Sequence, residues 1–208
     1  RIRSGIGGNR QVASRHVAAR SLDDLTWPLH TERLTIRRPT PADAADVFAY
    51  RCREDVARWL TAWVTDEAEF RDDFPKRSES MLVIERDGDL IGDVMVRITS
   101  PWAQTEVADE VAGRQAELGW VLHPDATGNG YAGEAVAAVI DVCFDDVDGL
   151  GMHRIEANCF ADNEASWRLM ERLGMRREVH TIDESWHRDR RWHDGLGYAI
   201  LSREWRKD

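Results

Sequence analysis

The chain has 208 residues, enough for one ordinary domain with its own core and too few for two. Hydrophobic residues make up 42% and charged residues 32%, which excludes disordered and low-complexity classes. The formal net charge of −10 argues against a general nucleic-acid binder, because neutralising phosphates needs a basic face, and it favours a cationic ligand.

Cysteine usage and hydropathy indicate a cytoplasmic protein. Cys52, Cys143 and Cys159 lie far apart and form no CxxC pair, so neither a disulfide framework nor a cysteine zinc site is predicted. The apolar run at residues 135–140 is far shorter than the roughly 20 residues that cross a bilayer. We therefore expect a reducing environment and no membrane association.

The start of the chain differs from the rest. Residues 1–20 contain five arginines and no acid, and no apolar stretch of the kind a signal peptide needs follows them. We expect residues 1–28 to form an N-terminal extension and residues 29–208 to form the folded domain. Because position 1 is not methionine, a remnant of cloning is the favoured explanation of the extension.

The first half of the domain shows strand, helix and hairpin patterns in that order. Residues 33–37 alternate like a strand, and Pro41 lies near the first turn of the helix that follows. Two β-rich runs in residues 81–99 flank Asp87-Gly88, a dipeptide favoured in tight turns, and predict a hairpin. The helical patterns cover residues 39–51, 54–60 and 65–74.

The second half alternates strands with helices. Residues 100–115 are polar and predict a loop, and residues 116–123 predict a strand. A helix follows, with one apolar face at Ala132, Ala135, Val136, Val139, Ile140, Cys143 and Val147. The last predicted elements are a strand at 152–160, a helix at 162–174 closed by Gly174, and strands at 177–186 and 197–205. This order predicts a mixed α/β (α+β) fold.

A glycine-rich turn, residues 128–133, joins the strand to the first of these helices. Its free N–H groups can converge on a phosphate at the positive end of the helix dipole. The turn also reads as GxGxxG, the dinucleotide fingerprint. Two features count against that alternative: the glycines come five residues after the strand, and the acid expected about 20 residues later would fall near His153.

Four segments in order resemble the GNAT N-acetyltransferases, and within them the RimJ/RimL branch of ribosomal-protein N-terminal acetyltransferases. They are residues 31–44, 119–135, 159–178 and 190–205, and the similarity covers nearly the whole domain. The resemblance implies a single-domain fold with a central mixed, mostly antiparallel sheet, splayed at the acetyl-CoA site and flanked by about four helices.

The resemblance also implies a set of cofactor-binding residues. The family's phosphate loop, Arg/Gln-x-x-Gly-x-Gly/Ala, falls here on Thr127, Gly128, Asn129, Gly130, Tyr131 and Ala132. Thr127 replaces the usual Arg or Gln, and since such loops hold pyrophosphate mainly through main-chain N–H groups, we expect binding to survive. Backbone groups of Val121, Leu122 and His123 are expected to meet the pantetheine arm, although simple strand packing also explains these residues.

Many GNAT enzymes protonate the departing thiolate with a tyrosine at the position of Met170, which cannot donate a proton. In the RimL branch a serine three residues after an asparagine is thought to serve instead, which implies Ser166 as proton donor and Asn163 as a residue that positions pantetheine. The alternative is that Asn163 only caps its helix and Ser166 is a first-turn residue.

The general base is expected among acids near the splayed strands. Glu117, on the strand before the loop, is the first candidate. Asp183 and Glu184, in a late strand, are the second, because the RimL branch uses a glutamate in that region through water. Each of these acids can also be an ordinary solvated residue.

Histidines and tryptophans form two further groups. His180, His187 and His193 lie among acids, but their spacing matches no zinc signature, so a polar hairpin tip and no metal are predicted. The tryptophans Trp59, Trp63 and Trp102 lie in or beside segments that form the acceptor cleft in the resembling family, with core packing as the default.

The predicted function is transfer of an acetyl group from acetyl-CoA to a primary amine, by direct attack in a ternary complex. An α-amine of a protein N-terminus is favoured by the branch, and it costs only about 1 kcal/mol to deprotonate at pH 7 against roughly 4–5 for lysine. Aminoglycosides or polyamines are alternative acceptors, a non-catalytic CoA-binding sensor is an alternative function, and a homodimer is left open.

Overall fold

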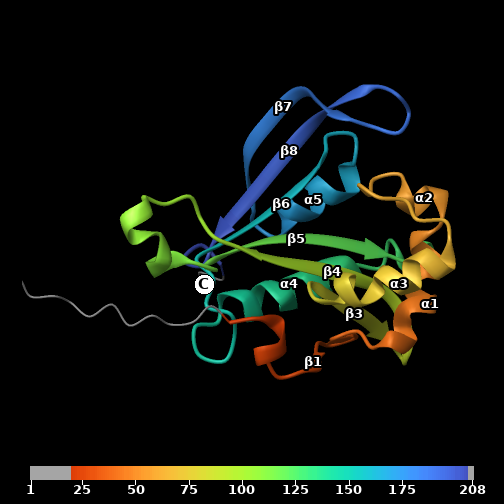
Figure 1. Cartoon of the computed structure of the whole chain (residues 1–208), viewed down its shortest axis with the longest axis horizontal. Helices are drawn as coiled ribbons and strands as arrows, with labels where there is room; N and C mark the ends of the chain where they lie inside the picture. Colours follow the sequence, from red (N-terminus) through yellow and green to blue (C-terminus); the bar gives the residue numbers. More distant parts are fainter. Residues whose placement is uncertain (1–19, 206–208) are drawn as a thin grey trace, which may run out of the picture.

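The computed structural model describes residues 20–205, which form one eight-stranded mixed sheet. The strand order is β1-β2-β3-β4-β5-β6-β8-β7, and every neighbouring pair is antiparallel except β5 and β6 (Figure 1). The predicted single-domain α/β fold is confirmed. The strands are β1 Leu29–His30, β2 Thr35–Arg37, β3 Met81–Arg86, β4 Asp89–Thr99, β5 Gln115–Leu122, β6 Arg154–Phe160, β7 Arg176–Trp186 and β8 Trp192–Leu201.

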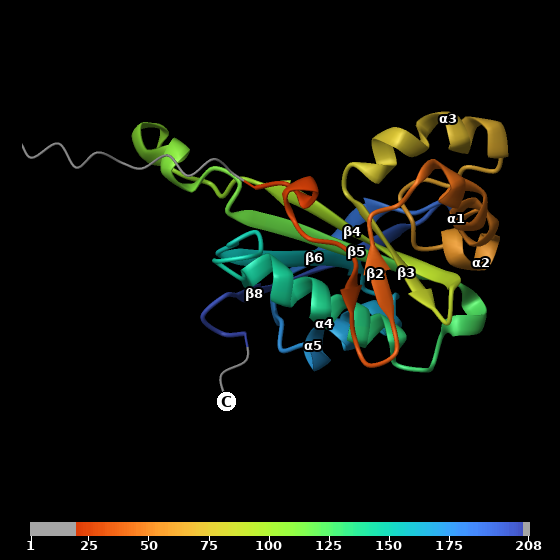
Figure 2. The same cartoon turned by 90° about the horizontal axis from the view of Figure 1, so that it is seen from below.

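Helices cover both faces of the sheet (Figure 2). One face carries α1 Ala44–Arg51, α2 Glu54–Ala57 and α3 Glu67–Ser78, and the other carries α4 Tyr131–Phe144 and α5 Glu164–Arg172. Within residues 20–205, α2 is a single turn, so the number of longer α-helices agrees with the four expected.

Alternation along the strands divides the core between the two faces. Leu82 and Ile84 of β3 pack in the cluster with α4 and α5, whereas Met81 and Val83 pack with α1 and α3. All four side chains are buried. A strand with helices on both faces therefore appears in the sequence as a continuous apolar run rather than as an alternating one.

The hairpin and the helix α4 follow from local sequence signals. Asp87 and Gly88 both have positive φ, 53° and 91°, as a primed two-residue turn requires, which confirms the predicted hairpin. The predicted apolar face of α4 is buried from Ala135 to Cys143, but Ala132 is half-buried and Val147 is 73% exposed. The helix ends at Phe144 because the Asp145 carboxylate accepts the N–H groups of Val147 and Asp148 and begins a turn.

Several boundaries differ from the expectation: β8 begins at Trp192 rather than at residue 197, and α2 ends at Ala57 rather than at residue 60. Leu22 is 4% exposed and belongs to the core, and its carbonyl accepts the Trp27 indole N–H, so residues 20–28 pack on the domain rather than extending from it. Residues 1–19 of the expected extension lie outside the described residues. The loop at 100–115 contains a 3₁₀ helix, Thr105–Val111, none of whose residues is buried. No helix in residues 20–205 combines the length and apolar character needed to cross a bilayer.

A buried ion pair joins α1 to the middle of the sheet. Asp93 of β4 is fully buried, and its carboxylate accepts hydrogen bonds from the Tyr50 hydroxyl at 2.5 Å and from Arg51 Nε at 2.9 Å. A second Arg51 nitrogen reaches the other carboxylate oxygen at 2.5 Å. Asp93 lies directly opposite Val121 of β5, so this ion pair fixes the strand that precedes the glycine-rich turn.

Replacing Asp93 with alanine is expected to lower the free energy of unfolding by about 3–5 kcal/mol, because it leaves the Arg51 charge buried without a partner. Urea denaturation measures the change. Asp23→Ala is the control, since Asp23 pairs with Arg38 but its side chain is 78% exposed. Equal effects of the two substitutions would contradict this account.

Candidate active site

The sheet opens between its two parallel strands. Hydrogen-bonded pairs join β5 to β6 only from Gln115 to Glu117, and no pair within the described residues joins residues 118–122 to residues 157–160. β5 stays paired with β4 up to Leu122, and β6 stays paired with β8 up to Phe160. The two strands therefore diverge from a common end, as Figure 1 shows, and leave main-chain N–H and C=O groups facing the gap.

The turn between β5 and α4 leaves its N–H groups free. Gly128 and Gly130 have positive φ, 78° and 82°, and the side chains of Thr127 and Asn129 fold back onto carbonyls of the same turn. Among residues 20–205, the main-chain N–H groups of 128–133 have no hydrogen-bond acceptor. Six N–H groups around the N-terminus of a helix form a site for an anion.

Arg33 fixes this turn from the β1–β2 connection. Its guanidinium donates to the Asn129 carbonyl at 3.1 Å and to Glu134 at 2.7 Å, and it lies 4.7 Å from the centre of the Tyr131 ring. Burial raises the pKa of Glu134, but hydrogen bonds from Thr31 and Arg33 outweigh this effect and leave the pKa below its usual value. The pair therefore persists at neutral pH.

Arg86 brings a second guanidinium to the same turn, 5.1 Å from the Tyr131 ring centre. Arg33 and Arg86 are about half exposed and are paired with Glu134 and Asp87, respectively. Neither arginine was predicted from the sequence as a site residue. Arg33 lies 96 residues from the carbonyl that it contacts, so no local pattern could have shown the contact.

The N-terminus of α5 follows the free end of β6. Asn163 caps the helix, accepting the Ser166 N–H at 3.4 Å. Within the described residues, the Ser166 hydroxyl and the Asn163 amide nitrogen make no hydrogen bond, so both stay available to a ligand while Asn163 also serves as the cap. Met170, at the position of the family's tyrosine, is 1% exposed and packs in the core.

The candidate bases lie at different ends of the gap. Glu117 is opposite Glu156 on the last paired rung, and its carboxylate pairs with Arg97. Glu184 lies in a bulge of β7, against Gly195, which pairs with Phe160. The two positions are about 13 Å apart along β6, since a strand rises about 3.3 Å per residue. The structure therefore does not bring the two carboxylates together.

Asp183, the other candidate in this bulge, has a positive φ of 49°. Its N–H donates to the Asp194 carboxylate at 3.0 Å, which fixes the backbone of the bulge.

Two of the cysteines are poor nucleophiles. Cys143 is buried, and burial raises the pKa of its thiol to about 12. Burial likewise raises the pKa of Cys159 to about 11. Neither is a thiolate at neutral pH, which disfavours a covalent acyl-cysteine intermediate on them.

The tryptophans assigned to the acceptor cleft separate into two groups. Trp59 is half-buried and contacts Phe160 and His187, with ring centres 5.9 and 5.7 Å away. Trp63 is 41% exposed, whereas Trp102 is 99% exposed on the 100–115 loop, so core packing does not explain these two side chains.

Comparison with known proteins agrees with this geometry. A family model described as an acetyltransferase (GNAT) domain matches residues 33–176. The uncharacterized N-acetyltransferase YnaD of Bacillus subtilis is 32% identical over 181 residues, which cover 84% of this chain and 97% of YnaD. A GNAT-family acetyltransferase from Bacillus anthracis matches with a TM-score of 0.71 at 29% identity, over 86% of this chain and 100% of that one.

Two more distant structures share the fold. RimL, described as a ribosomal L7/L12 alpha-N-protein acetyltransferase and solved with coenzyme A, matches 82% of this chain and 95% of its own, with a TM-score of 0.70 at 16% identity. The spermidine N-acetyltransferase SpeG of Vibrio cholerae matches 83% and 95%, with a TM-score of 0.64 at 20% identity. The chain therefore belongs to the GNAT family of N-acetyltransferases, which use acetyl-CoA as the acetyl donor.

Proposed function

We propose that the chain transfers an acetyl group from acetyl-CoA directly to a primary amine, and that the favoured acceptor is the α-amine of a protein N-terminus. The observation that carries this proposal is the combination of the gap between β5 and β6 with the six free N–H groups at the start of α4. The gap is elongated and leads toward the anion site, which suits a pantetheine arm that ends in a pyrophosphate.

In this proposal the cofactor contacts two segments. Of the expected residues Val121, Leu122 and His123, Leu122 is the one whose main-chain groups pair with the pantetheine amides. The His123 N–H donates to the Ile91 carbonyl at 2.8 Å, and because alternate residues of a strand bond to the same partner, Val121 also bonds toward β4. The pyrophosphate binds the turn formed by Thr127, Gly128, Asn129, Gly130, Tyr131 and Ala132. Arg33 and Arg86 flank that turn but are paired with Glu134 and Asp87, so in a loop that lacks the usual Arg or Gln at position 127 the main-chain N–H groups are the principal ligands of the pyrophosphate.

The chemistry requires a base for the amine and a proton donor for the thiolate. The Ser166 hydroxyl donates to the departing sulfur, and the Asn163 amide orients the pantetheine end next to it. Of the two bases, Glu184 is better placed than Glu117, because Glu184 and Ser166 both lie near the Phe160 end of the gap. Raised thiol pKa values at Cys143 and Cys159 support direct attack rather than transfer through these cysteines.

The acceptor is inferred from energetics and from the relatives. An α-amine asks less of a general base than lysine does. RimL is described as acting on a protein α-amine and SpeG as acting on spermidine, so a polyamine or an aminoglycoside is the second candidate class. The net charge of −10 suits either kind of cation.

A CoA-binding sensor without turnover is the alternative function. Its support is that Thr127 and Met170 replace the family's usual phosphate-loop residue and its tyrosine.

Release of CoA thiol from acetyl-CoA tests the proposal, with a panel of N-terminal peptides, lysine peptides, polyamines and aminoglycosides. We expect turnover with N-terminal peptides above all other acceptors. Turnover confined to polyamines or aminoglycosides would overturn the acceptor assignment, and thermal stabilisation by acetyl-CoA without turnover on any acceptor would favour the sensor.

Ser166→Ala is expected to lower kcat by about 100-fold or more, with little change in the KM for acetyl-CoA, because general acid catalysis contributes on this scale. Ser202→Ala is the matched control. Ser202 is half-buried like Ser166, but it follows the end of β8 that pairs with Arg154, away from the Phe160 end of the gap. Alanine is a good helix former, so the fold of α5 is preserved. Unchanged kcat in Ser166→Ala would eliminate the proton-donor role.

A further inference from the structure

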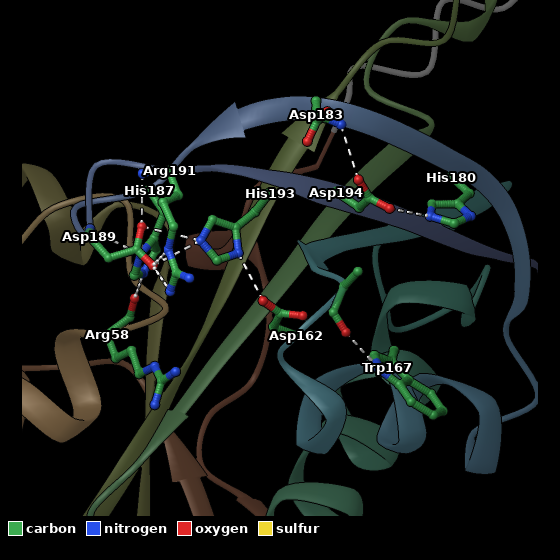
Figure 3. Close-up of polar contacts among 11 residues, drawn as sticks. Arg58, Asp162, Trp167, His180, Asp183, His187, Asp189, Arg191, His193 and Asp194 are labelled. Atoms are coloured by element: carbon green, nitrogen blue, oxygen red, sulfur yellow. Dashed lines mark hydrogen bonds and ion pairs between the residues drawn. The ribbon is translucent and has the colours of Figure 1, made fainter.

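A second polar site lies at the tip of the β7–β8 hairpin. His187, Asp189 and His193 come together there, and one ligand atom from each lies within 4.8 Å of the other two (Figure 3). One oxygen of the Asp189 carboxylate, Oδ1, lies between the rings, 3.1 Å from His187 Nδ1 and 3.2 Å from His193 Nε2. Two imidazole nitrogens and one carboxylate oxygen thus face one small volume.

The opposite nitrogen of each histidine is held by its own acceptor. His187 Nε2 donates to the Arg58 carbonyl at 2.8 Å, and His193 Nδ1 lies 2.9 Å from the Asp162 carboxylate. Metal-binding histidines almost always show this arrangement, because the outer acceptor fixes the tautomer and directs the other nitrogen at the metal. The arrangement directs His187 Nδ1 and His193 Nε2 at the Asp189 carboxylate, and His187 Nδ1 also accepts the Asp189 main-chain N–H at 3.2 Å, a bond that a metal ion on this nitrogen replaces.

The two histidines are largely buried, whereas Asp189 lies at the surface. The side chains of His187 and His193 are 7% and 11% exposed, and the Phe160 ring packs edge-on against both, with centres 5.2 and 6.0 Å away. Arg191 pairs with Asp189 Oδ2 at 2.9 Å.

We propose that His187, Asp189 and His193 bind a divalent first-row transition metal ion, with Zn²⁺ as the favoured ion. Imidazole and carboxylate ligands suit this group of metals, and three protein ligands leave a coordination position for water. The metal replaces the hydrogen bonds between Asp189 and the two rings, while Arg191 stays on the outer carboxylate oxygen. Histidine spacing predicted a polar hairpin tip and no metal, because it does not show that the Arg58 carbonyl and Asp162 lie beside the two rings.

The position of the site gives the metal a structural role. Arg58 follows α2, Asp162 precedes α5, and the three ligands belong to the hairpin, so the bound ion fastens the hairpin tip to both neighbouring segments. Trp59 packs on His187 in the same place. The metal therefore stabilises the packing of α2 and the β7–β8 hairpin against each other beside Phe160, the last residue of β6.

Calorimetric titration of Zn²⁺ into chelator-treated protein without a histidine tag tests this proposal. We expect one Zn²⁺ per chain, a higher melting temperature with Zn²⁺, and visible absorption bands when Co²⁺ is used instead. His193→Gln removes a ligand and is expected to abolish binding, whereas Asp162→Asn keeps all three ligands and is expected to weaken binding by about 10–100-fold.

His180→Ala is the matched control, because His180 lies on the same hairpin and pairs with Asp194 at 3.0 Å without a second histidine. It is expected to bind Zn²⁺ as the wild type does. Melting temperatures in the presence of chelator establish that each variant is folded. Absence of stoichiometric Zn²⁺ and Co²⁺ binding by the wild type, or equal binding by wild type and His193→Gln, would overturn the proposal.

Discussion

The separation of β5 from β6 is the constraint on which the site depends. Three paired residues hold the strands together, and beyond Glu117 each strand has one edge without a partner. Unpaired main-chain groups need water or a ligand, since leaving them unsatisfied costs free energy. In our proposal the amides of pantetheine take this place, so the cofactor completes the sheet at the same time as it presents its thioester to an acceptor.

The gap persists because both strands are held from their outer sides. β5 is paired with β4 throughout the gap, and the buried ion pair of Asp93 and Arg51 ties β4 to α1 directly opposite Val121. β6 is paired with β8 along its whole length. At the end of the gap Arg33 fixes the glycine-rich turn. Closing the gap would require several of these contacts to break together.

Local signals in the sequence predicted the elements but not the contacts between distant segments. The Asp87-Gly88 hairpin and the apolar face of α4 were predicted because turn chemistry and helical periodicity are local, and Val147 was misplaced because the Asp145 turn ends the helix first. The contacts of Arg33 with the glycine-rich turn, and those of Arg58 and Asp162 with the histidines of the hairpin tip, join residues far apart in the chain. The roles of Ser166 and of the acids stay predictions, since they rest on the family resemblance and on placement.

Hydrogen–deuterium exchange of the main-chain amides, with and without acetyl-CoA, tests the central claim most directly. The account predicts that acetyl-CoA slows exchange in residues 118–123 of β5 and in residues 128–133 of the turn, and that NAD at the same concentration does not. Residues 83–85 of β3, which are paired with both β2 and β4, serve as the internal reference. Unchanged exchange in both segments at saturating acetyl-CoA would contradict the account.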